Sequence, residues 1–331
     1  VEHRGDIRSI LKDNHRLDLL YALSSQRELL LEWYDFEPEA EVLQVGADYG
    51  ALTGLFRSSV RAVTVLDDTE SALETVRQRY PGAANIYYRK DSLAGYAAEA
   101  CAEGKKYDYV IFAGTLTAPY EKHIHAAKSL LKPDGILIVA LANALGMKYF
   151  AGTVEEENAL TKRQLAELLC GDKETQSMAD ESGTLKFYYP MPDYKTPVSI
   201  YSDAYLPKKG DLTRVTPAYD YPPYHLMEQG EKFDTVCEAG LFDLYANSYL
   251  VFWSADPKQL QKEDERIFMK YNKTRREEFQ IKTCICERNV IGAAGASGAA
   301  GADATGNSAA GKKERYVEKA ALSLDGSAHI A

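Results

Sequence analysis

Two glycines and one acidic residue follow consecutive apolar segments in a pattern that suits nucleotide chemistry. The segment "LQVGADYGALTG" places Gly46 and Gly50 in a turn between an expected strand and an expected helix. A glycine turn there lets a ligand approach the backbone at the carboxyl end of the strand. Asp67 ends the next apolar segment, where its carboxylate can accept hydrogen bonds from both hydroxyls of a ribose. A tight turn and a helix cap are the plain structural alternatives.

Polar or small residues also end the two strands that are expected next. Asp91 and Ser92 follow the third strand, where a side chain can accept a hydrogen bond from an adenine amino group. Either residue can equally cap the helix that follows. Gly114 ends the fourth strand, at the point where the winding of the sheet reverses. These strand ends together predict a hollow for one adenosyl ligand.

Strands and helices alternate along the part of the chain that carries these residues. Helices are expected between the strands, at residues 51–59, 69–80 and 121–131. Apolar strands that alternate with amphipathic helices are typical of a parallel sheet with both faces covered. Sequence segments with this character predict seven strands, at residues 41–46, 62–67, 84–91, 107–114, 135–143, 184–190 and 247–254.

The flanking segments differ in character. Residues 6–34 have helical spacing, and residues 191–245 form a long insertion rich in Pro, Tyr and Asp between the sixth and seventh strands. Residues 258–280 are charged and are expected to begin as a helix, whereas 292–311 are Gly/Ala-rich and flexible. We therefore divide the chain into a helical segment (1–39), a main domain (40–255) and an extension (256–331).

Composition narrows the classes of partner. The chain has 331 residues and a net charge of −10, and without a long basic stripe it is not expected to bind nucleic acid. Its five cysteines include no CxxC pair, so we expect no zinc or other metal site and a reducing, cytoplasmic location. The longest apolar run, residues 136–142, is too short to span a bilayer. The first residue is Val1, so a longer parent chain stays open.

With its "LLKPDGILIV" segment, the chain resembles the class I S-adenosylmethionine-dependent methyltransferases over roughly residues 40–255. The first motif of that family has an acid followed by Gly-x-Gly-x-Gly, and the matching positions here hold Gln44, Gly46, Asp48 and Gly50. The family's acid helps to hold the methionine amino group of the cofactor. Gln44 carries no charge, but Asp48 restores one nearby.

The resemblance implies a fold, a cofactor and an activity. The fold is an α/β Rossmann-like, doubly wound sheet of seven strands, parallel except for an antiparallel last strand beside the fifth. N-terminal helices precede this sheet, and an insertion separates strands 6 and 7. The implied cofactor is S-adenosyl-L-methionine, and the implied activity is methyl transfer. The implied cofactor-binding residues are Gln44, Gly46, Asp48, Gly50, Asp67, Asp91, Ser92 and Gly114.

Three short segments show a narrower resemblance. "ANALGMKYFAG", "KFYYPMPDYKTP" and "IYSDAYLPKKG" are similar to parts of methyltransferase domains in multidomain bacterial enzymes of surface-polysaccharide assembly. The first segment often reads Glu-Asn-Arg in those relatives, whereas this chain retains only Asn143 of the three. The similarity implies O-methylation of a saccharide or glycan precursor by one part of a longer chain. The segment "RYVEKAAL" is similar to a strand of kinase-like folds, so the extension also predicts the start of a further domain.

Methyl transfer to oxygen requires alignment and the removal of one proton. His225 in the insertion is the first candidate for the base, and Asp193 and Lys195 in "MPDYK" come next. An exposed loop histidine is the alternative interpretation of His225. Tyrosines of the insertion suit a sugar-binding wall or plain packing. The expected acceptor-binding residues are Asn143, Tyr149, Tyr194 and Tyr201.

Two rival functions remain. A nicotinamide-dependent oxidoreductase would need Gly-x-Gly-x-x-Gly after the first strand, and the spacing of Gly46 and Gly50 does not provide it. An antiparallel strand beside the fifth would also favour the methyltransferase fold. The second rival is a degenerate methyltransferase fold that serves as a non-catalytic scaffold, which the changes at Gln44 and Asp48 motivate.

Overall fold

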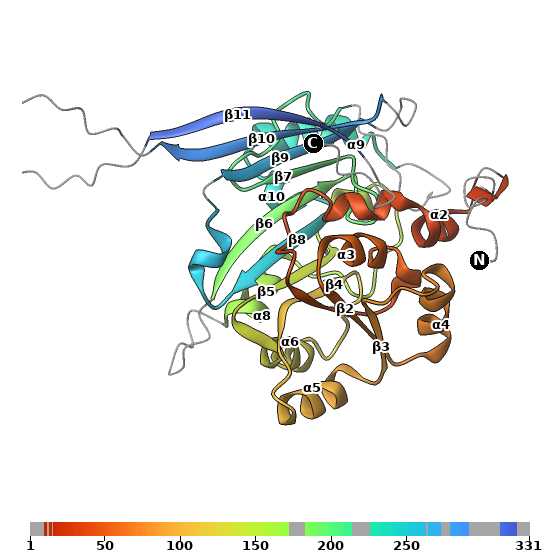
Figure 1. Cartoon of the computed structure of the whole chain (residues 1–331). Helices are drawn as coiled ribbons and strands as arrows, with labels where there is room; N and C mark the ends of the chain where they lie inside the picture. The colour runs from red at the N-terminus through yellow and green to blue at the C-terminus, as the bar shows by residue number, and fades with distance from the viewer. Residues whose placement is uncertain are drawn as a thin grey trace, which may run out of the picture.

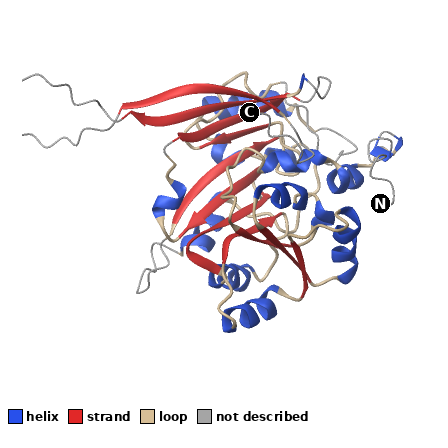
Figure 2. Ribbon diagram, in the orientation of Figure 1, coloured by secondary structure: helices blue, strands red, loops and turns tan. Residues whose placement is uncertain are grey.

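The computed structural model describes residues 10–11, 13–14, 16–171, 183–213, 226–262, 264–272, 279–290 and 312–322. One mixed sheet runs through these residues (Figures 1 and 2). Its strands are β1 (Glu41–Val45), β2 (Ala62–Asp67), β3 (Ile86–Lys90), β4 (Tyr107–Ala113), β5 (Leu131–Ala142), β6 (Thr184–Met191), β7 (Ser199–Ser202), β8 (Ser248–Ser254), β9 (Asp264–Asn272), β10 (Ile281–Val290) and β11 (Lys312–Ala321). Their order is β11-β10-β9-β7-β6-β8-β5-β4-β1-β2-β3.

The first five strands form the parallel part of the sheet. β1 pairs with β2 and β4, while β3 and β5 lie outside that trio. Val42, Leu43, Val63 and Val65 are buried, because helices cover both faces. The prediction of a Rossmann-like α/β core from apolar runs and helical spacing is confirmed.

Helices connect these strands and end at recognisable signals. The connecting helices are α3 (Thr53–Ser59), α4 (Glu70–Arg79), α5 (Leu93–Ala102) and α6 (Tyr120–Ser129). In α8 (Lys162–Cys170), Thr161 and Gln164 form a capping box, and Gly171 ends the helix with φ +75°. Near the N-terminus, α2 (Leu17–Leu23) is followed by the 3₁₀ helix η2 (Ser25–Leu30), which Ser24 caps. The remaining helices are η3 (Asp48–Gly50), α7 (Met147–Phe150), α9 (Gln229–Glu238), α10 (Phe242–Tyr245) and η4 (Pro257–Leu260).

β8 is the strand that distinguishes this sheet from a plain parallel one. It lies between β5 and β6 and runs antiparallel to both. The register pairs Ile136 with Ser254 and Ala142 with Ser248. This is the antiparallel strand beside the fifth that the resemblance implied.

The expected number of seven strands is wrong, because the sheet has eleven. β7 adds to β6 within the insertion, and β9, β10 and β11 continue outward as an antiparallel meander. The helix expected at the start of residues 258–280 is limited to η4 and then gives way to β9. In β9, every second residue (Ile267, Met269 and Tyr271) is buried. This alternation is typical of a strand, although charged residues lie between the buried ones.

The N-terminal residues cover one face of the sheet and reach its far strands. Tyr271 in β9 donates a hydrogen bond to the Leu29 carbonyl at 2.9 Å, and Arg266 donates to the Trp33 carbonyl at 2.6 Å. Figure 1 shows β9–β11 along one edge of the molecule and α4 and α5 toward the opposite side. Within the described ranges, every helix is too short or too polar to cross a membrane.

Candidate functional site

The turn after β1 contains several left-handed backbone angles. Gly46, Asp48, Tyr49 and Gly50 have φ of +87°, +40°, +52° and +74°. For a residue with a side chain, such an angle costs roughly 1–2 kcal/mol, whereas glycine adopts it freely. Strain of this kind concentrates at functional sites, provided that neighbouring groups hold it in place.

Asp67, at the end of β2, supports this turn. One carboxylate oxygen accepts the Ala47 N–H at 2.9 Å, and the other accepts the Thr69 N–H at 2.9 Å. A carboxylate offers about four acceptor positions, so each oxygen retains capacity for another donor. Asp67 is half-buried at the place where the ends of β1 and β2 meet.

Gln44 is turned inward and is fully used by the turn. Its amide nitrogen donates to the carbonyls of Gly46 and Ala47 at 3.1 and 3.3 Å, and its amide oxygen accepts from Thr53 Oγ1 at 2.8 Å. Only 4% of the residue is exposed. The amide at position 44 therefore stabilises the backbone of the turn.

Asp48 carries the charge at this turn, and its partner comes from the N-terminal segment. Arg27 Nη2 lies 2.6 Å from Asp48 Oδ2. The Arg27 side chain is 3% exposed and that of Asp48 is 29% exposed. Burial opposes the charge of Arg27, but the carboxylate of Asp48 outweighs it and raises the pKa of the guanidinium.

Arg27 joins the turn to the end of β4 and to the loop after β6. Its guanidinium also donates to the carbonyls of Ala113 at 3.4 Å and Tyr194 at 3.3 Å. The ring of Tyr194 lies against Gly114, where an added Cβ would come within 2.8 Å of the ring carbons. Burial raises the pKa of the Tyr194 hydroxyl well above its usual value, and Glu156 and Asp193 act in the same direction.

A second charged cluster continues from Tyr194. Its hydroxyl donates to Glu156 Oε2 at 3.2 Å, and Lys148 Nζ lies 2.7 Å from both Glu156 Oε1 and Asp193 Oδ2. Lys195 Nζ approaches Glu156 Oε1 at 3.2 Å. Burial opposes the charge of Lys148, but the two carboxylates raise its pKa. Burial alone would raise the pKa of Glu156, whereas Lys148 and Lys195 lower it.

Two predicted site residues, Asp193 and Lys195, belong to this cluster and differ in their burial. Asp193 has no exposed surface, and its second oxygen accepts the Lys195 N–H at 2.9 Å. The Lys195 side chain is 20% exposed. Tyr149 contributes its hydroxyl, which accepts the Glu156 N–H at 3.3 Å. The structure thus brings Asp193, Tyr194, Lys195 and Tyr149 together around Glu156.

Asp91 and Ser92 follow β3 beside Asp67, whose carbonyl accepts the Asp91 N–H at 3.2 Å. Ser92 caps α5 by accepting the Gly95 N–H at 3.1 Å, and Asp91 accepts the Ser92 N–H at 2.7 Å. Asn143 is fully buried and donates to the carbonyls of Leu244 and Ala246. The hydrogen bonds of Asp91, Ser92 and Asn143 thus stabilise a helix cap and loops of the chain itself.

Tyr201 packs between aromatic rings of the insertion and β9. Its ring centroid is 4.8 Å from that of Phe268 and 6.0 Å from that of Phe242. Only 4% of Tyr201 is exposed, and Asn143 is wholly enclosed. This burial argues against the predicted acceptor contacts of both residues.

His225 lies outside the described residues. The described chain resumes at Leu226, whose N–H donates to the Ala151 carbonyl at 3.1 Å. Ala151 directly follows α7, the helix that carries Lys148. This part of the insertion is therefore tied to the loop that contains Glu156.

Sequence reasoning missed Arg27, Lys148 and Glu156. Lys148 lies within the segment "ANALGMKYFAG", so that resemblance drew attention to its neighbourhood but not to the residue itself. Arg27 and Glu156 lie in segments where the sequence shows helical spacing or plain charge. Their roles depend on partners far along the chain, which no local pattern indicates.

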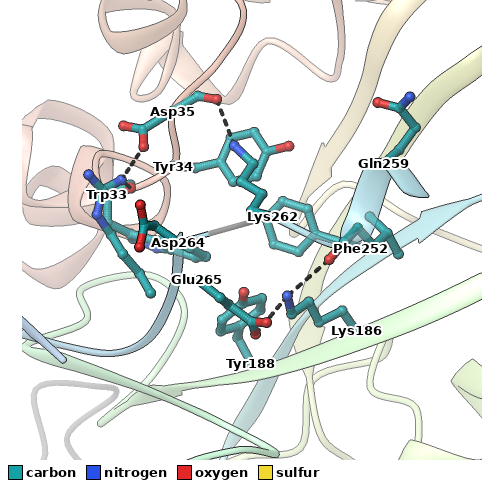
Figure 3. Close-up of a pocket in the computed structure, with 12 residues that line it drawn as sticks. Trp33, Tyr34, Asp35, Lys186, Tyr188, Phe252, Gln259, Lys262, Asp264 and Glu265 are labelled. Carbon is teal, nitrogen blue, oxygen red and sulfur yellow. Dashed lines mark hydrogen bonds and ion pairs between the residues drawn. The ribbon is translucent and has the colours of Figure 1, made fainter. Parts of the chain in front are cut away.

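A separate hollow lies beneath η4 and β9 (Figure 3). Its rim is polar, since Lys262 donates to the Asp35 carbonyl at 3.1 Å and Lys186 pairs with Glu265 at 2.6 Å. Lys262 Nζ also lies 4.3 Å from the centre of the Tyr34 ring. The hollow measures about 30 Å³, which is space for a water molecule but not for a nucleoside. This hollow is therefore too small to be the site of the expected ligand.

Comparisons with known proteins found distant solved structures. No protein-family model and no curated protein matches the sequence. Among solved structures, a precorrin 8w decarboxylase from Methanobacterium thermoautotrophicum is 13% identical, with 70% of this chain and 90% of that chain covered and a TM-score of 0.37. At this identity and TM-score the likeness supports no inference about activity.

Two solved methyltransferases are similarly distant. The N-methyltransferase NodS from Bradyrhizobium japonicum, in complex with S-adenosylhomocysteine, is 18% identical, with 42% of this chain and 68% of that chain covered and a TM-score of 0.32. Phosphoethanolamine N-methyltransferase 1 from Haemonchus contortus is 12% identical, with 76% and 48% covered and a TM-score of 0.43. The fold assignment therefore stands on the strand order and register of this chain.

Proposed function

We propose that this chain binds S-adenosyl-L-methionine at the carboxyl ends of β1, β2 and β4 and transfers its methyl group. The observation that carries the proposal is the β3-β2-β1-β4-β5-β8-β6 order with antiparallel β8, together with Asp67 at the end of β2. Asp67 has spare acceptor positions for a ribose diol, and the turn beside it bears a carboxylate on Asp48. The donor and acceptor set thus fits an adenosyl ligand with a charged amino-acid end.

The bound cofactor would supply an activated methyl group, so the chain has to orient the acceptor and manage one proton. Lys195 and Glu156 are the partly exposed members of the charged cluster and would contact the acceptor. Asp193, with both oxygens engaged, would act by holding Lys148 and the Lys195 backbone in place. His225 stays the proposed base, and the Leu226 anchor to Ala151 supports it.

We propose a hydroxyl of a saccharide or glycan precursor on the cytoplasmic side as the acceptor. Its support is the similarity of the segments around Lys148 and Asp193 to polysaccharide-assembly methyltransferases. Hydrogen-bonding groups at Glu156 and Lys195 suit an acceptor of this polarity.

Asp67→Ala is expected to lower the affinity for S-adenosylhomocysteine at least about tenfold, because hydrogen bonds to a charged group contribute about 1.5–3 kcal/mol. Isothermal titration calorimetry on the purified chain measures this affinity. Absence of wild-type binding at millimolar ligand would reject the cofactor proposal. An unchanged affinity in the variant would remove Asp67 from the site.

One observation favours the scaffold alternative. Side chains cover the open sides of two strand-end glycines, because Thr115 lies 2.5 Å from an added Cβ at Gly46 and Tyr194 covers Gly114. Close packing of this kind around the strand ends is suited to a structural role. Saturable cofactor binding without turnover on a panel of glycan acceptors would support this alternative.

A further inference from the structure

We infer that Asp48 binds the ammonium group at the amino-acid end of the cofactor, and that buried Arg27 holds Asp48 in place for this task. The inference rests on the proposed function and deepens it. It gives the N-terminal segment a part in ligand selection, although that segment precedes the whole sheet.

Position 44 cannot bind this ammonium group in the observed geometry. Both hydrogens of the Gln44 amide nitrogen are directed to the carbonyls of Gly46 and Ala47. The amide oxygen accepts from Thr53 within a buried setting. A carboxylate at position 44 would face two carbonyl oxygens and would repel them. The charge that the resemblance places at this position therefore has to come from another residue.

Asp48 meets the chemical requirement. Its Oδ2 pairs with Arg27, while its Oδ1 has no hydrogen-bond partner in the part of the chain that the structure describes. The side chain is 29% exposed, so a cationic donor can approach the carboxylate from solvent. A charge-assisted hydrogen bond between an ammonium group and a carboxylate is among the strong polar contacts in proteins.

Arg27 acts as a positioning residue rather than as a ligand contact. It is 3% exposed, and its guanidinium is engaged by Asp48 and by the carbonyls of Ala113 and Tyr194. These contacts fix Arg27 against β4 and the loop after β6 before any ligand arrives. The ion pair in turn holds Asp48 at φ +40°, an angle that a free aspartate rarely adopts. Such prior ordering lowers the entropy cost of binding.

Titrations with three nucleosides separate the contribution of the ammonium group to affinity from the contributions of the other groups. S-adenosylhomocysteine has the ammonium and carboxylate groups, decarboxylated S-adenosylhomocysteine keeps only the ammonium group, and 5′-methylthioadenosine has neither. Calorimetric titrations of the full chain compare wild type with Asp48→Asn and Arg27→Met. Asp68→Asn is the matched control, because Asp68 is an exposed carboxylate that bonds only to Thr69 among described contacts.

Asp48→Asn is expected to lower the affinity for both ammonium-bearing ligands roughly tenfold, as a lost charge-assisted hydrogen bond predicts. The affinity for 5′-methylthioadenosine should stay within twofold, and Asp68→Asn should change none of the three. Arg27→Met should reproduce the selective loss, because Asp48 would no longer be held. Circular dichroism and thermal melting verify folding, and Arg27→Lys provides a second variant if Arg27→Met unfolds.

Equal losses for all three nucleosides in Asp48→Asn would overturn the inference, as would an unchanged affinity for the ammonium-bearing pair. A loss confined to S-adenosylhomocysteine would show that binding of the ammonium group alone does not depend on Asp48, and it would also overturn the inference. If wild type binds 5′-methylthioadenosine but no variant discriminates, only the inference fails. If wild type binds none of the three nucleosides, the proposed function fails with it.

Discussion

At the scale of single residues, the ammonium group of Lys148 and its partner Asp193 are the most enclosed charges among the described residues of the site. It lies between Asp193 and Glu156 at 2.7 Å from each, and both Lys148 and Asp193 are essentially unexposed. A buried ion pair of this kind contributes little net stability compared with an apolar pair, but removing one partner leaves the other charge without compensation. Its value here is that it fixes the loop after β6 against α7.

Lys148→Met should lower the free energy of unfolding by about 3–5 kcal/mol, because Asp193 would remain buried without its cation. The double variant Lys148→Met/Asp193→Leu should recover most of that loss, because no unpaired charge remains. Urea denaturation followed by far-UV circular dichroism measures both. A single variant as stable as wild type would show that solvent reaches Asp193.

Residue-scale prediction from sequence succeeds where the signal is local. Asp67 and Gly46 stand out because each follows directly on a recognisable strand, and both lie at the strand ends in the structure. The Arg27–Asp48 and Lys148–Asp193 pairs connect positions 21 and 45 residues apart. No local spacing in the sequence indicates such distant partners. Of the charged cluster, the sequence therefore predicts Asp193 and Lys195, and only the fold identifies Lys148 and Glu156.

At the scale of elements, the turn after β1 is the best test of local geometry. Gly46→Ala should lower the free energy of unfolding by about 1–3 kcal/mol more than Gly82→Ala, through overpacking against Thr115. The two glycines have similar left-handed angles, +87° and +71°, but an added Cβ at Gly82 meets nothing within 4 Å. Chemical denaturation of both variants separates packing from backbone strain. Equal losses would mean that Thr115 moves aside freely.

Elements with a clear apolar period were predicted close to their observed bounds, and those with mixed composition were not. β1, β2, β4 and β8 match the expected segments within a residue or so, since their side chains are buried on both faces. β9 lies within residues 258–280, for which the charged composition predicts a helix at the start and indicates no strand. Its inward positions alternate nonetheless, and pairing with β7 and β10 decides its conformation.

At the scale of the whole molecule, β9–β11 belong to the same sheet as the parallel core. Met269→Ala, at a fully buried position of β9, should lower the unfolding midpoint of the entire chain and cost about 2–5 kcal/mol. The fluorescence of Trp33 and Trp253, the two tryptophans, and far-UV circular dichroism should shift together. A fluorescence transition that stays at its wild-type midpoint would mean that the outer strands unfold as a separate unit.

The number of strands could not be predicted because pairing is a property of the assembled sheet. The core order follows from motifs, but β7 has only four residues and lies within an insertion without strong periodicity. The segment of β11 is similar to a strand in the sequence, yet only its register with β10, which itself pairs with β9, assigns it to this sheet. The separation of the extension (256–331) from the main domain (40–255) stays a prediction, and the unfolding experiment on Met269→Ala tests it.

The contacts between β9 and the N-terminal segment bear on how the protein is made. Trp33, Asp35 and Leu29 receive hydrogen bonds from Arg266 and Tyr271, more than two hundred residues later in the chain (Figure 3 shows part of this neighbourhood). A ribosome releases the early residues long before it has synthesised the later ones. Residues 29–35 therefore lack these hydrogen-bond partners until translation reaches β9.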